Sequence, residues 1–445
     1  MDFLGLIPSF GSFFFTIAAF VVALSIIVAV HEYGHYIVGR WSGIHADVFS
    51  IGFGPVLVSR RDRRGTLWQI AALPLGGYVK FAGDADAASG KDGAAMEAMP
   101  EEARRHTMHG APLWARSATV AAGPVFNFIF AIVVFAGFMM VRGVAQEDPV
   151  VGAMHPAPPE VVQQLQPGDV ILQVAGIEVA GLSDYYSAVA QIAPAASVPH
   201  LVERGGTRLQ IDGPFPQPPV VGSVSPQSAA RDAGLRAGDV ILRADDMPVH
   251  AFGQLRDITA ASEGRPIALD VWRNGEVFSV DLSPRSTDLP LPGGGFETRW
   301  LIGLTSGTIF EHATRTPGPV EALGMASEQT WLVIRTSLEG LFYMITGAIS
   351  TCNIAGPIGI AETSAAMASD GLGDFIWFIA VLSVAVGLLN LFPIPILDGG
   401  HLVFHAWEAV TGKPPSDRAL RVLMAIGLAM LVTLMVFALT NDLFC

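Results

Sequence analysis

Two histidines and a glutamate lie within five residues in the segment IVAVHEYGHYIVGR, residues 27–40. On a helix, the spacing H-E-x-x-H places His31 and His35 on one face, one turn apart, where both can bind one zinc ion. Glu32 then lies beside the open coordination position, where it can act as a general base. The alternative interpretation is chance, or histidines that hydrogen-bond to neighbouring helices.

The surroundings of this motif favour the zinc interpretation. No charged residue occurs from Phe13 to Val30, so the motif continues an apolar run that is long enough to cross a bilayer. Ionisable side chains at membrane depth are costly and are usually functional. A metal transporter that uses such residues in its pathway is a further alternative, but the sequence does not contain the inverted repeats with broken helices that this class favours.

A catalytic zinc ion has three protein ligands and one water, so a third ligand is needed. The chain has two cysteines, Cys352 and Cys445, too few for a disulfide framework or a cysteine metal site. The best candidate is Asp398 in NLFPIPILDGGH, at the end of the third apolar run. Helices one and three enter from the same side, and at a rise of 1.5 Å per residue His31 and Asp398 lie at similar depth.

The elements that position these residues are membrane spans. The 445-residue chain is 51% hydrophobic and only 15% charged, whereas about a quarter of the residues in soluble proteins are charged. The apolar residues gather in four runs, at about 13–38, 117–141, 375–397 and 420–440. We therefore expect a polytopic α-helical membrane protein with four transmembrane helices. The net charge of −14 argues against nucleic-acid binding.

Basic residues predict the orientation of these spans. The loops between spans one and two and between spans three and four carry lysines and arginines, whereas none precedes Arg40. By the positive-inside rule both loops are cytoplasmic. Both termini and the insert from about 145 to 320 then lie on the outer side, and the metal site lies near the cytoplasmic side.

The insert contains an internal repeat. Residues 150–179 and 220–249 align without a gap, and each contains L-x-x-G-D-x-I-L, a pattern similar to that of PDZ domains. We expect two inserted α+β PDZ-like domains in which the Gly-Asp pair forms a structural turn. The expected ranges are 145–215 and 216–285 for the PDZ-like domains, 286–319 for a linker, and 320–347 for an amphipathic helix on the membrane surface.

A membrane-associated β-hairpin region is predicted after the first span. Residues 47–84 alternate apolar with polar side chains between Gly and Pro turn signals. The last part, LPLGGYVKF (73–81), is apolar enough to enter the membrane face. The membrane core then consists of residues 1–144 and 348–445.

Three motifs in this order, HEYGH, AAGPVFNF and NLFPIPILDGG, together with the tandem PDZ-like insert and NIAGPIGIAE (353–362), resemble the site-2 protease family over nearly the whole chain. The resemblance implies an intramembrane zinc metalloprotease of the bacterial inner membrane. One zinc ion per chain would be held by His31, His35 and Asp398, with Glu32 as the catalytic base. Substrates in the lipid bilayer would be single-span proteins, such as anti-sigma factors already trimmed by another protease, or remnant signal peptides. The PDZ-like domains and both termini would be periplasmic.

The resemblance also implies a set of substrate-binding residues. These are Asn390, Pro393, Pro395, Gly76, Gly77 and Tyr78. Asn390 would clamp an extended substrate strand, because the two prolines after it prevent a regular helix. The 73–81 segment would be a re-entrant β-loop that adds the substrate as a strand.

Three alternatives stay open. Asn390 can instead be a helix-terminal cap before proline, and Asn127 in GPVFNF can be a packing residue between helices. A catalytically inactive PDZ membrane scaffold is the alternative function, although the intact Glu32 and the complete set of candidate ligands count against it.

Overall fold

The computed structural model describes residues 7–444 except for 86–95, 97, 160, 226–227 and 291–295. The chain forms two compact units. The first contains Met1–Phe138, Pro319–Ile345 and Thr351–Cys445, and the second contains Met139–Gly318 and Thr346–Ser350.

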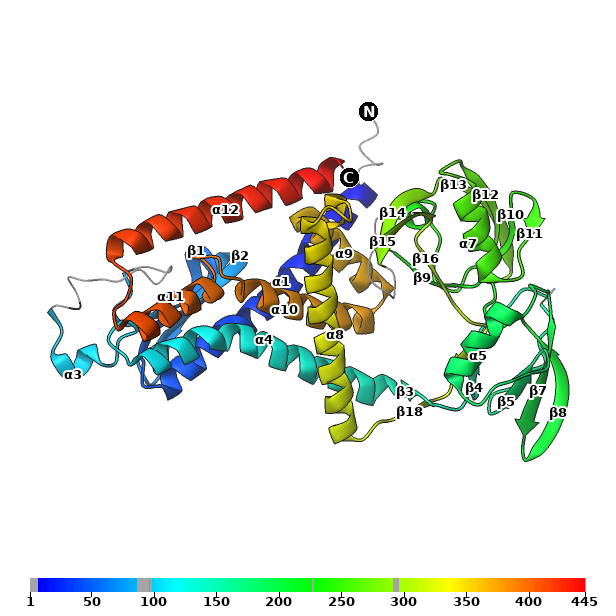
Figure 1. The fold of residues 1–445 in the computed structure, drawn as a ribbon, viewed down its shortest axis with the longest axis horizontal. Helices are drawn as coiled ribbons and strands as arrows, with labels where there is room; N and C mark the ends of the chain where they lie inside the picture. The colour runs from blue at the N-terminus through cyan, green and yellow to red at the C-terminus, as the bar shows by residue number, and fades with distance from the viewer. Residues whose placement is uncertain are drawn as a thin grey trace. The chain divides into compact units, whose positions relative to one another are not determined.

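Among the described residues, four helices of the first unit are long and apolar enough to cross a membrane (Figure 1). They are α1 (Ile7–Trp41), α4 (Leu113–Arg142), α10 (Leu372–Asn390) and α12 (Asp417–Phe444). The third expected run, 375–397, needs a correction, because α10 ends at Asn390 and two prolines follow that cannot continue a helix. Asp398 therefore does not end a span. It begins a separate helix, α11 (Asp398–Thr411).

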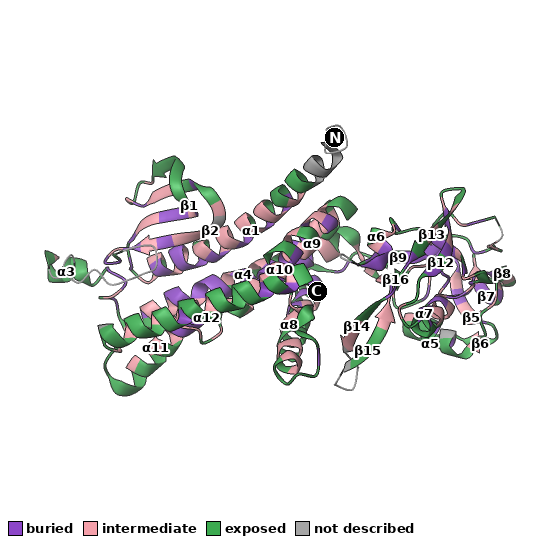
Figure 2. Cartoon of the chain, turned by 90° about the horizontal axis from the view of Figure 1, so that it is seen from above, coloured by how far each residue is buried: buried purple, intermediate pink, exposed green. Residues whose placement is uncertain are grey.

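Hydropathy did not predict the helix α9 (Pro357–Asp370), which packs against α1, α10 and α12. Its N-terminus is held by Asp442 of α12, whose carboxylate accepts hydrogen bonds from the amides of Gly356, Ile358 and Gly359. A carboxylate at this position satisfies free helix amides and interacts favourably with the helix dipole. Most of α12 is otherwise exposed (Figure 2).

Close to this contact, Cys352 is disulfide-bonded. The sequence has one other cysteine, Cys445, which lies outside the described residues. In the same region, Asn441 of α12 donates a hydrogen bond of 2.7 Å to the carbonyl of Thr351.

The predicted β-region consists of two long antiparallel strands, β1 (Ala46–Arg61) and β2 (Leu67–Phe81). Both strands bend, so that Ser50 pairs with Gln69 on one side and with Tyr78 on the other. The segments therefore lie in the order 56–61, 67–71, 46–51 and 77–81, which leaves 77–81 at an edge of the sheet.

Helix α8 (Pro319–Ile345) lies at the position of the amphipathic helix expected at 320–347. Ala322 and Ala326 pack against α4 and α10, whereas large apolar side chains such as Leu332 and Phe342 are exposed. Small residues allow close approach between helices. The helix thus packs on the membrane core through alanines, and bulky apolar side chains such as Leu332 remain exposed.

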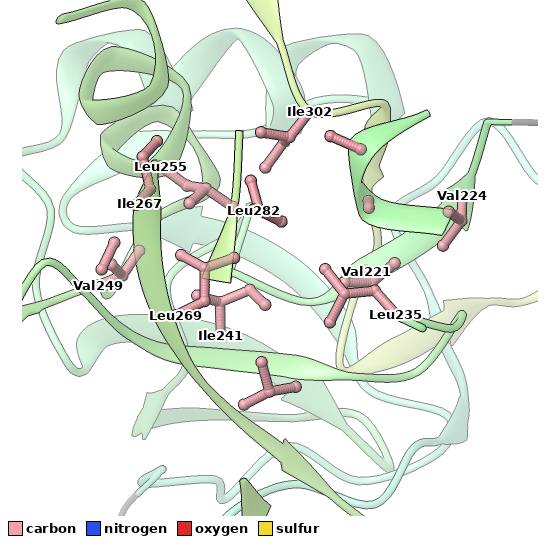
Figure 3. Close-up of a cluster of buried hydrophobic side chains, with 14 residues drawn as sticks. Val221, Val224, Leu235, Ile241, Val249, Leu255, Ile267, Leu269, Leu282 and Ile302 are labelled. Atoms are coloured by element: carbon pink, nitrogen blue, oxygen red, sulfur yellow. The ribbon is translucent and has the colours of Figure 1, made fainter. Parts of the chain in front are cut away.

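The second unit contains two sheets with equivalent strand orders, β6-β5-β7-β8 and β11-β10-β12-β13. The first consists of β5 (Val170–Val174), β6 (Ile177–Glu178), β7 (Val198–Arg204) and β8 (Thr207–Gly213), with α5 (Leu182–Ala188). The second consists of β10 (Val240–Ala244), β11 (Met247–Pro248), β12 (Ile267–Arg273) and β13 (Glu276–Leu282), with α7 (Phe252–Ala261). Figure 3 shows the core of the second copy, in which Ile241, Leu255 and Leu269 are fully buried.

The Gly-Asp turns have the structural role predicted for them. Asp169 is buried and forms an ion pair of 2.7 Å with Arg204, and Asp239 forms the equivalent pair of 2.6 Å with Arg273. Each aspartate also accepts a backbone hydrogen bond within its own turn. Both aspartates therefore join the turn to the neighbouring strand.

The linker expected at 286–319 is wrong, because most of its described residues form strands. β14 (Arg285–Pro290) pairs with β15 (Phe296–Leu301), β16 (Leu304–Ser306) with β9 (Val221–Val224), β17 (Phe310–His312) with β4 (Val151–Met154), and β18 (Thr314–Arg315) with β3 (Val144–Ala145). Each repeat therefore uses a strand from beyond 300, and the domain ranges 145–215 and 216–285 are too short. Short strands in a Gly- and Pro-rich segment give almost no periodicity.

The remaining described elements are short. They are the helices α3 (Glu101–Arg104) and α6 (Ala229–Asp232) and the 3₁₀ turns Val189–Gln191 and Thr351–Asn353.

Candidate metal centre

His31 and His35 lie one turn apart on α1 and direct their Nε2 atoms to the same point, 3.1 Å from each other. Oδ2 of Asp398, the first residue of α11, lies 3.1 Å from His31 Nε2 and 3.5 Å from His35 Nε2. No other His, Cys, Asp or Glu cluster with this spacing occurs in the part of the chain that the structure describes. The structure thus brings together the three residues predicted as ligands.

The arrangement fits a zinc ion. Asp398 Oδ2 is buried, and the nearby ring nitrogens are not in hydrogen-bonding geometry with it, so it has no such partner among the described residues. A buried carboxylate oxygen without a partner is costly, and a metal ion would satisfy it. Two imidazole nitrogens and one carboxylate oxygen form a donor set typical of catalytic zinc.

The two histidines also act on the charge of Asp398. Burial raises the pKa of this carboxyl group, but protonated His35 and His31 lower the pKa by more, so the pKa lies below its ordinary value.

Helix α4 supports the two histidines without contributing a ligand. Nδ1 of His35 donates a hydrogen bond of 2.8 Å to the carbonyl of Thr119, which leaves Nε2 with its lone pair free. Gly123 lies between the two rings, and a Cβ at this position would come within 2.7 Å of His31 Nε2. The glycine of AAGPVFNF is therefore required for the close approach of α4.

Glu32 lies beside the ligands in a cavity of about 280 Å³. The same cavity is lined by Gly77, Tyr78 and Asn390. The backbone N–H of Val79, in the edge segment of β2, interacts with the Glu32 carboxylate. The predicted base is thus located between the three candidate ligands and a strand edge.

The structure brings only part of the predicted substrate-binding set to this cavity. Within the described residues, Pro393, Pro395 and Gly76 do not line it. Asn390 does, but its Nδ2 donates a hydrogen bond of 3.0 Å to the carbonyl of Val386 in the preceding turn. This local bond holds the Asn390 side chain on its own helix.

Sequence reasoning missed a polar stripe on α11. His401, His405 and Glu408 follow Asp398 at spacings of three, four and three, which places them on one helix face. His405 Nδ1 lies 3.2 Å from Ser117 Oγ of α4. The spacing in LDGGHLVFHAWE indicates a polar helix face. The position of α4 beside this face, which the sequence does not show, is needed to interpret it.

Burial perturbs the histidines of this stripe. Burial, together with the charge of Arg116, lowers the pKa of His405 to about 4, and burial also lowers the pKa of His401. Both side chains are therefore neutral at neutral pH.

A buried His-His-Asp cluster with a glutamate beside it, on a helix able to span a membrane, defines a membrane metalloprotease. Residues 19–434 match peptidase family M50. The chain belongs to this family, that of the site-2 proteases, and it is a zinc metalloprotease.

Relatives match over almost their whole length. A Rhizobium meliloti protein named as a zinc metalloprotease is 36% identical over 429 residues, which cover 96% of each chain. The regulator of sigma-E protease RseP of Escherichia coli is 35% identical over 461 residues, covering 97% of this chain and 99% of RseP. Among solved structures, the PDZ domain of an SdrC-like protein from Listeria monocytogenes matches 20% of this chain and 87% of that domain, at 21% identity and a TM-score of 0.17.

Proposed function

We propose that this zinc metalloprotease cleaves peptide bonds within the transmembrane segments of single-span proteins, as a step of regulated intramembrane proteolysis. The observation that carries the proposal is the position of the HEYGH motif inside α1, a helix with the length and hydropathy of a membrane span. Relatives named as regulators of sigma-E support substrates of the anti-sigma-factor type. Trimming by another protease before cleavage, and remnant signal peptides as further substrates, belong to the same proposal.

His31, His35 and Asp398 would hold the zinc ion, and Glu32 would serve as general base. Bound zinc supplies a Lewis acid that polarises the scissile carbonyl and lowers the pKa of a water. Glu32 accepts the proton of the attacking water and then donates it to the leaving amine. Its location beside the three ligands supports this assignment.

The open edge at 77–81 would hold the substrate in extended form. A transmembrane helix hides its carbonyl groups in hydrogen bonds, so it must unwind before hydrolysis, and an exposed strand edge can pair with the freed backbone. Gly77 and Tyr78 border the cavity that contains Glu32, which supports this role. Asn390 would clamp the same strand after its Nδ2 exchanges the bond to the Val386 carbonyl for one to a substrate carbonyl.

The orientation is part of the proposal. Basic residues in the loops after α1 and after α11 support a cytoplasmic position for these loops and for the nearby metal site. The PDZ-like domains and both termini would be periplasmic, in a multi-pass protein of the inner membrane.

Co-expression with a panel of single-span reporters tests the substrate class. Each reporter is supplied intact and with its outer domain removed, and cleavage by the wild type is compared with cleavage by Glu32→Gln. We expect the wild type alone to cut trimmed reporters within their spans. Cleavage confined to sites outside the membrane segment, or equal cleavage by Glu32→Gln, would contradict the proposal.

A further inference from the structure

Asn127 of α4 is completely buried next to a candidate metal ligand. Its Nδ2 lies 3.2 Å from Nδ1 of His31, the ring nitrogen that points away from the other ligands. Its Oδ1 is buried and has no hydrogen-bond partner among the described residues. An unsatisfied buried amide oxygen is costly, so this arrangement calls for an explanation.

The tautomer of His31 supplies that explanation. A neutral imidazole that offers the lone pair of Nε2 to a metal must carry its proton on Nδ1, and this N–H needs an acceptor. Rotating the Asn127 amide by 180° exchanges Oδ1 with Nδ2 without displacing any other atom. Oδ1 then accepts the Nδ1 proton of His31, and the amide nitrogen takes the buried position that Oδ1 occupied.

The other histidine has the equivalent support from the same helix. His35 Nδ1 donates to the carbonyl of Thr119, at 2.8 Å. Thr119, Gly123 and Asn127 are spaced by four residues, so they share one face of α4. On this face Thr119 and Asn127 each offer one acceptor to a histidine. Gly123, which lies between them in the sequence, leaves room for both imidazole rings.

The surroundings hold Asn127 in place. Its backbone carbonyl accepts a hydrogen bond of 3.1 Å from Ser383 Oγ of α10. A Cβ added at Gly387 of α10 would lie 3.1 Å from the Asn127 Cβ, so α10 packs directly on this residue. The side chain therefore has little freedom to leave the imidazole.

We propose that Asn127 is a positioning residue of the metal centre: its side-chain oxygen accepts the Nδ1 proton of His31 and so presents Nε2 to zinc. The inference rests on the proposed role of His31 as a ligand. It replaces the interpretation of Asn127 as a packing residue. A packing role requires a side chain of similar shape at position 127, whereas a positioning role requires a side chain with a hydrogen-bond acceptor.

Two variants of the full-length protein separate these roles. Asn127→Leu keeps the approximate volume and removes the acceptor, whereas Asn127→Asp keeps the acceptor and forms a carboxylate–histidine–zinc arrangement. Zinc affinity is measured by competition with a chelator, and the d–d spectrum of the Co²⁺-substituted protein reports the ligand geometry. We expect Asn127→Leu to bind zinc about 10- to 100-fold more weakly, and Asn127→Asp to stay close to the wild type.

Two controls keep the outcome interpretable. Ser383→Ala removes a neighbouring hydrogen bond to the Asn127 backbone without touching the imidazole contact, and it should weaken zinc binding far less than Asn127→Leu. His31→Ala should lose zinc, and if it does not, the ligand assignment itself fails. If His31→Ala loses zinc while Asn127→Leu binds it as tightly as the wild type, only the inference about Asn127 is overturned. Equal weakening by Asn127→Leu and Asn127→Asp overturns it as well.

A measurement on the unaltered protein remains decisive if a variant does not fold. In the zinc-loaded protein with ¹⁵N-labelled histidine, the two ring nitrogens of His31 have distinct chemical shifts. The inference requires a protonated Nδ1 and a metal-bound Nε2. Metal binding through Nδ1 would refute it.

Discussion

Glu408 of α11 accepts two hydrogen bonds from the guanidinium group of Arg116 on α4, at 2.6 and 3.1 Å. Asp398 lies on the same face of α11, at its first turn, and is a candidate zinc ligand. The ion pair therefore fixes the helix that carries Asp398 to the helix that contacts His35 through Thr119. Such two-bond pairs of arginine with carboxylate are specific in geometry as well as strong.

Removing one member of this pair should weaken both the fold and the metal site. The side chains of Arg116 and Glu408 are only 15% and 17% exposed. Removal of one partner from a fully buried pair costs about 3–5 kcal/mol, so we expect about 1–3 kcal/mol here. Glu408→Gln should lower the free energy of unfolding by this amount and reduce zinc affinity.

The exposed pair Arg335–Glu339 on α8 is a matched control, whose loss should leave the stability nearly unchanged. Unfolding in a denaturing detergent, combined with chelator competition, measures both quantities. Glu408→Gln with wild-type stability and zinc affinity would show that the pair does not position α11.

The edge of β2 gives a second prediction. The Val79 N–H faces Glu32, while the same segment pairs with β1 on its other side. Val79→Pro removes this donor from the open edge, and it should strongly reduce cleavage of a trimmed reporter while zinc content stays the same.

Val79→Ala is the control for the proline substitution, because it loses most of the side chain but retains the N–H. It should retain more activity than Val79→Pro. If the two variants cleave equally well, neither the contact of this amide with Glu32 nor the open edge that carries it contributes to cleavage.

The pH dependence of stability should reflect the lowered pKa of His405 in the folded chain. Its pKa falls from 6.5 to about 4 in the folded chain. Between these two values the unfolded chain binds a proton that the folded chain does not, so stability decreases as the pH is lowered through this window. Arg116, His401, Glu408 and His109 are the ionisable groups that act on His405.

His405→Gln removes this proton uptake. Its stability should fall less than that of the wild type between pH 6.5 and 4, by about 1–2 kcal/mol after allowance for partial exposure. Subtracting the two pH profiles isolates His405 from the metal ligands, which titrate in both proteins. Superimposable profiles would contradict a neutral, half-buried His405.

We expect the second unit to act as a size filter that admits only substrates whose outer domain has been removed. Ala145 pairs with Thr314, so residues 146–313 can be replaced by a short Gly-Ser linker without separating the ends of the remaining chain. A deletion that stopped at 285 would leave the unpaired strands β16 and β17 behind. We expect the shortened protein to cut untrimmed reporters and to cut trimmed ones as before.

Recruitment of substrates by the PDZ-like domains predicts a different result for the same deletion. Trimmed reporters would be cut more slowly and untrimmed ones would stay resistant. Comparison of the two initial rates in membranes distinguishes the alternatives, and the second pattern would disprove the filter.

The parts of the fold that could be predicted from the sequence depend on local patterns. Long apolar runs locate α1, α4, α10 and α12, and H-E-x-x-H places two side chains on one helix face whatever surrounds it. Helix α9 was not predicted, because its small residues give a weaker hydropathy signal than those of a membrane span. Asp398 could be identified by depth, although the depth argument placed it at the end of a span instead of at the start of α11.

The parts that could not be predicted depend on pairing between distant segments. β17 completes the first repeat by pairing with β4, and nothing in its three residues specifies that partner. Likewise Asn127 acquires a role only because α4 passes the histidines at close range. Buried amides at helix interfaces usually contribute to packing, so the sequence alone favoured the less specific interpretation.

The most direct test of the account compares purified wild-type protein with Glu32→Gln in two assays, zinc content and cleavage of a trimmed single-span substrate. Because Glu32 moves protons and the metal is held by His31, His35 and Asp398, we predict about one zinc per chain in both proteins, with hydrolysis in the wild type alone. Full hydrolysis by Glu32→Gln, or a wild-type protein that cleaves equally well after complete removal of zinc, would contradict the assigned mechanism.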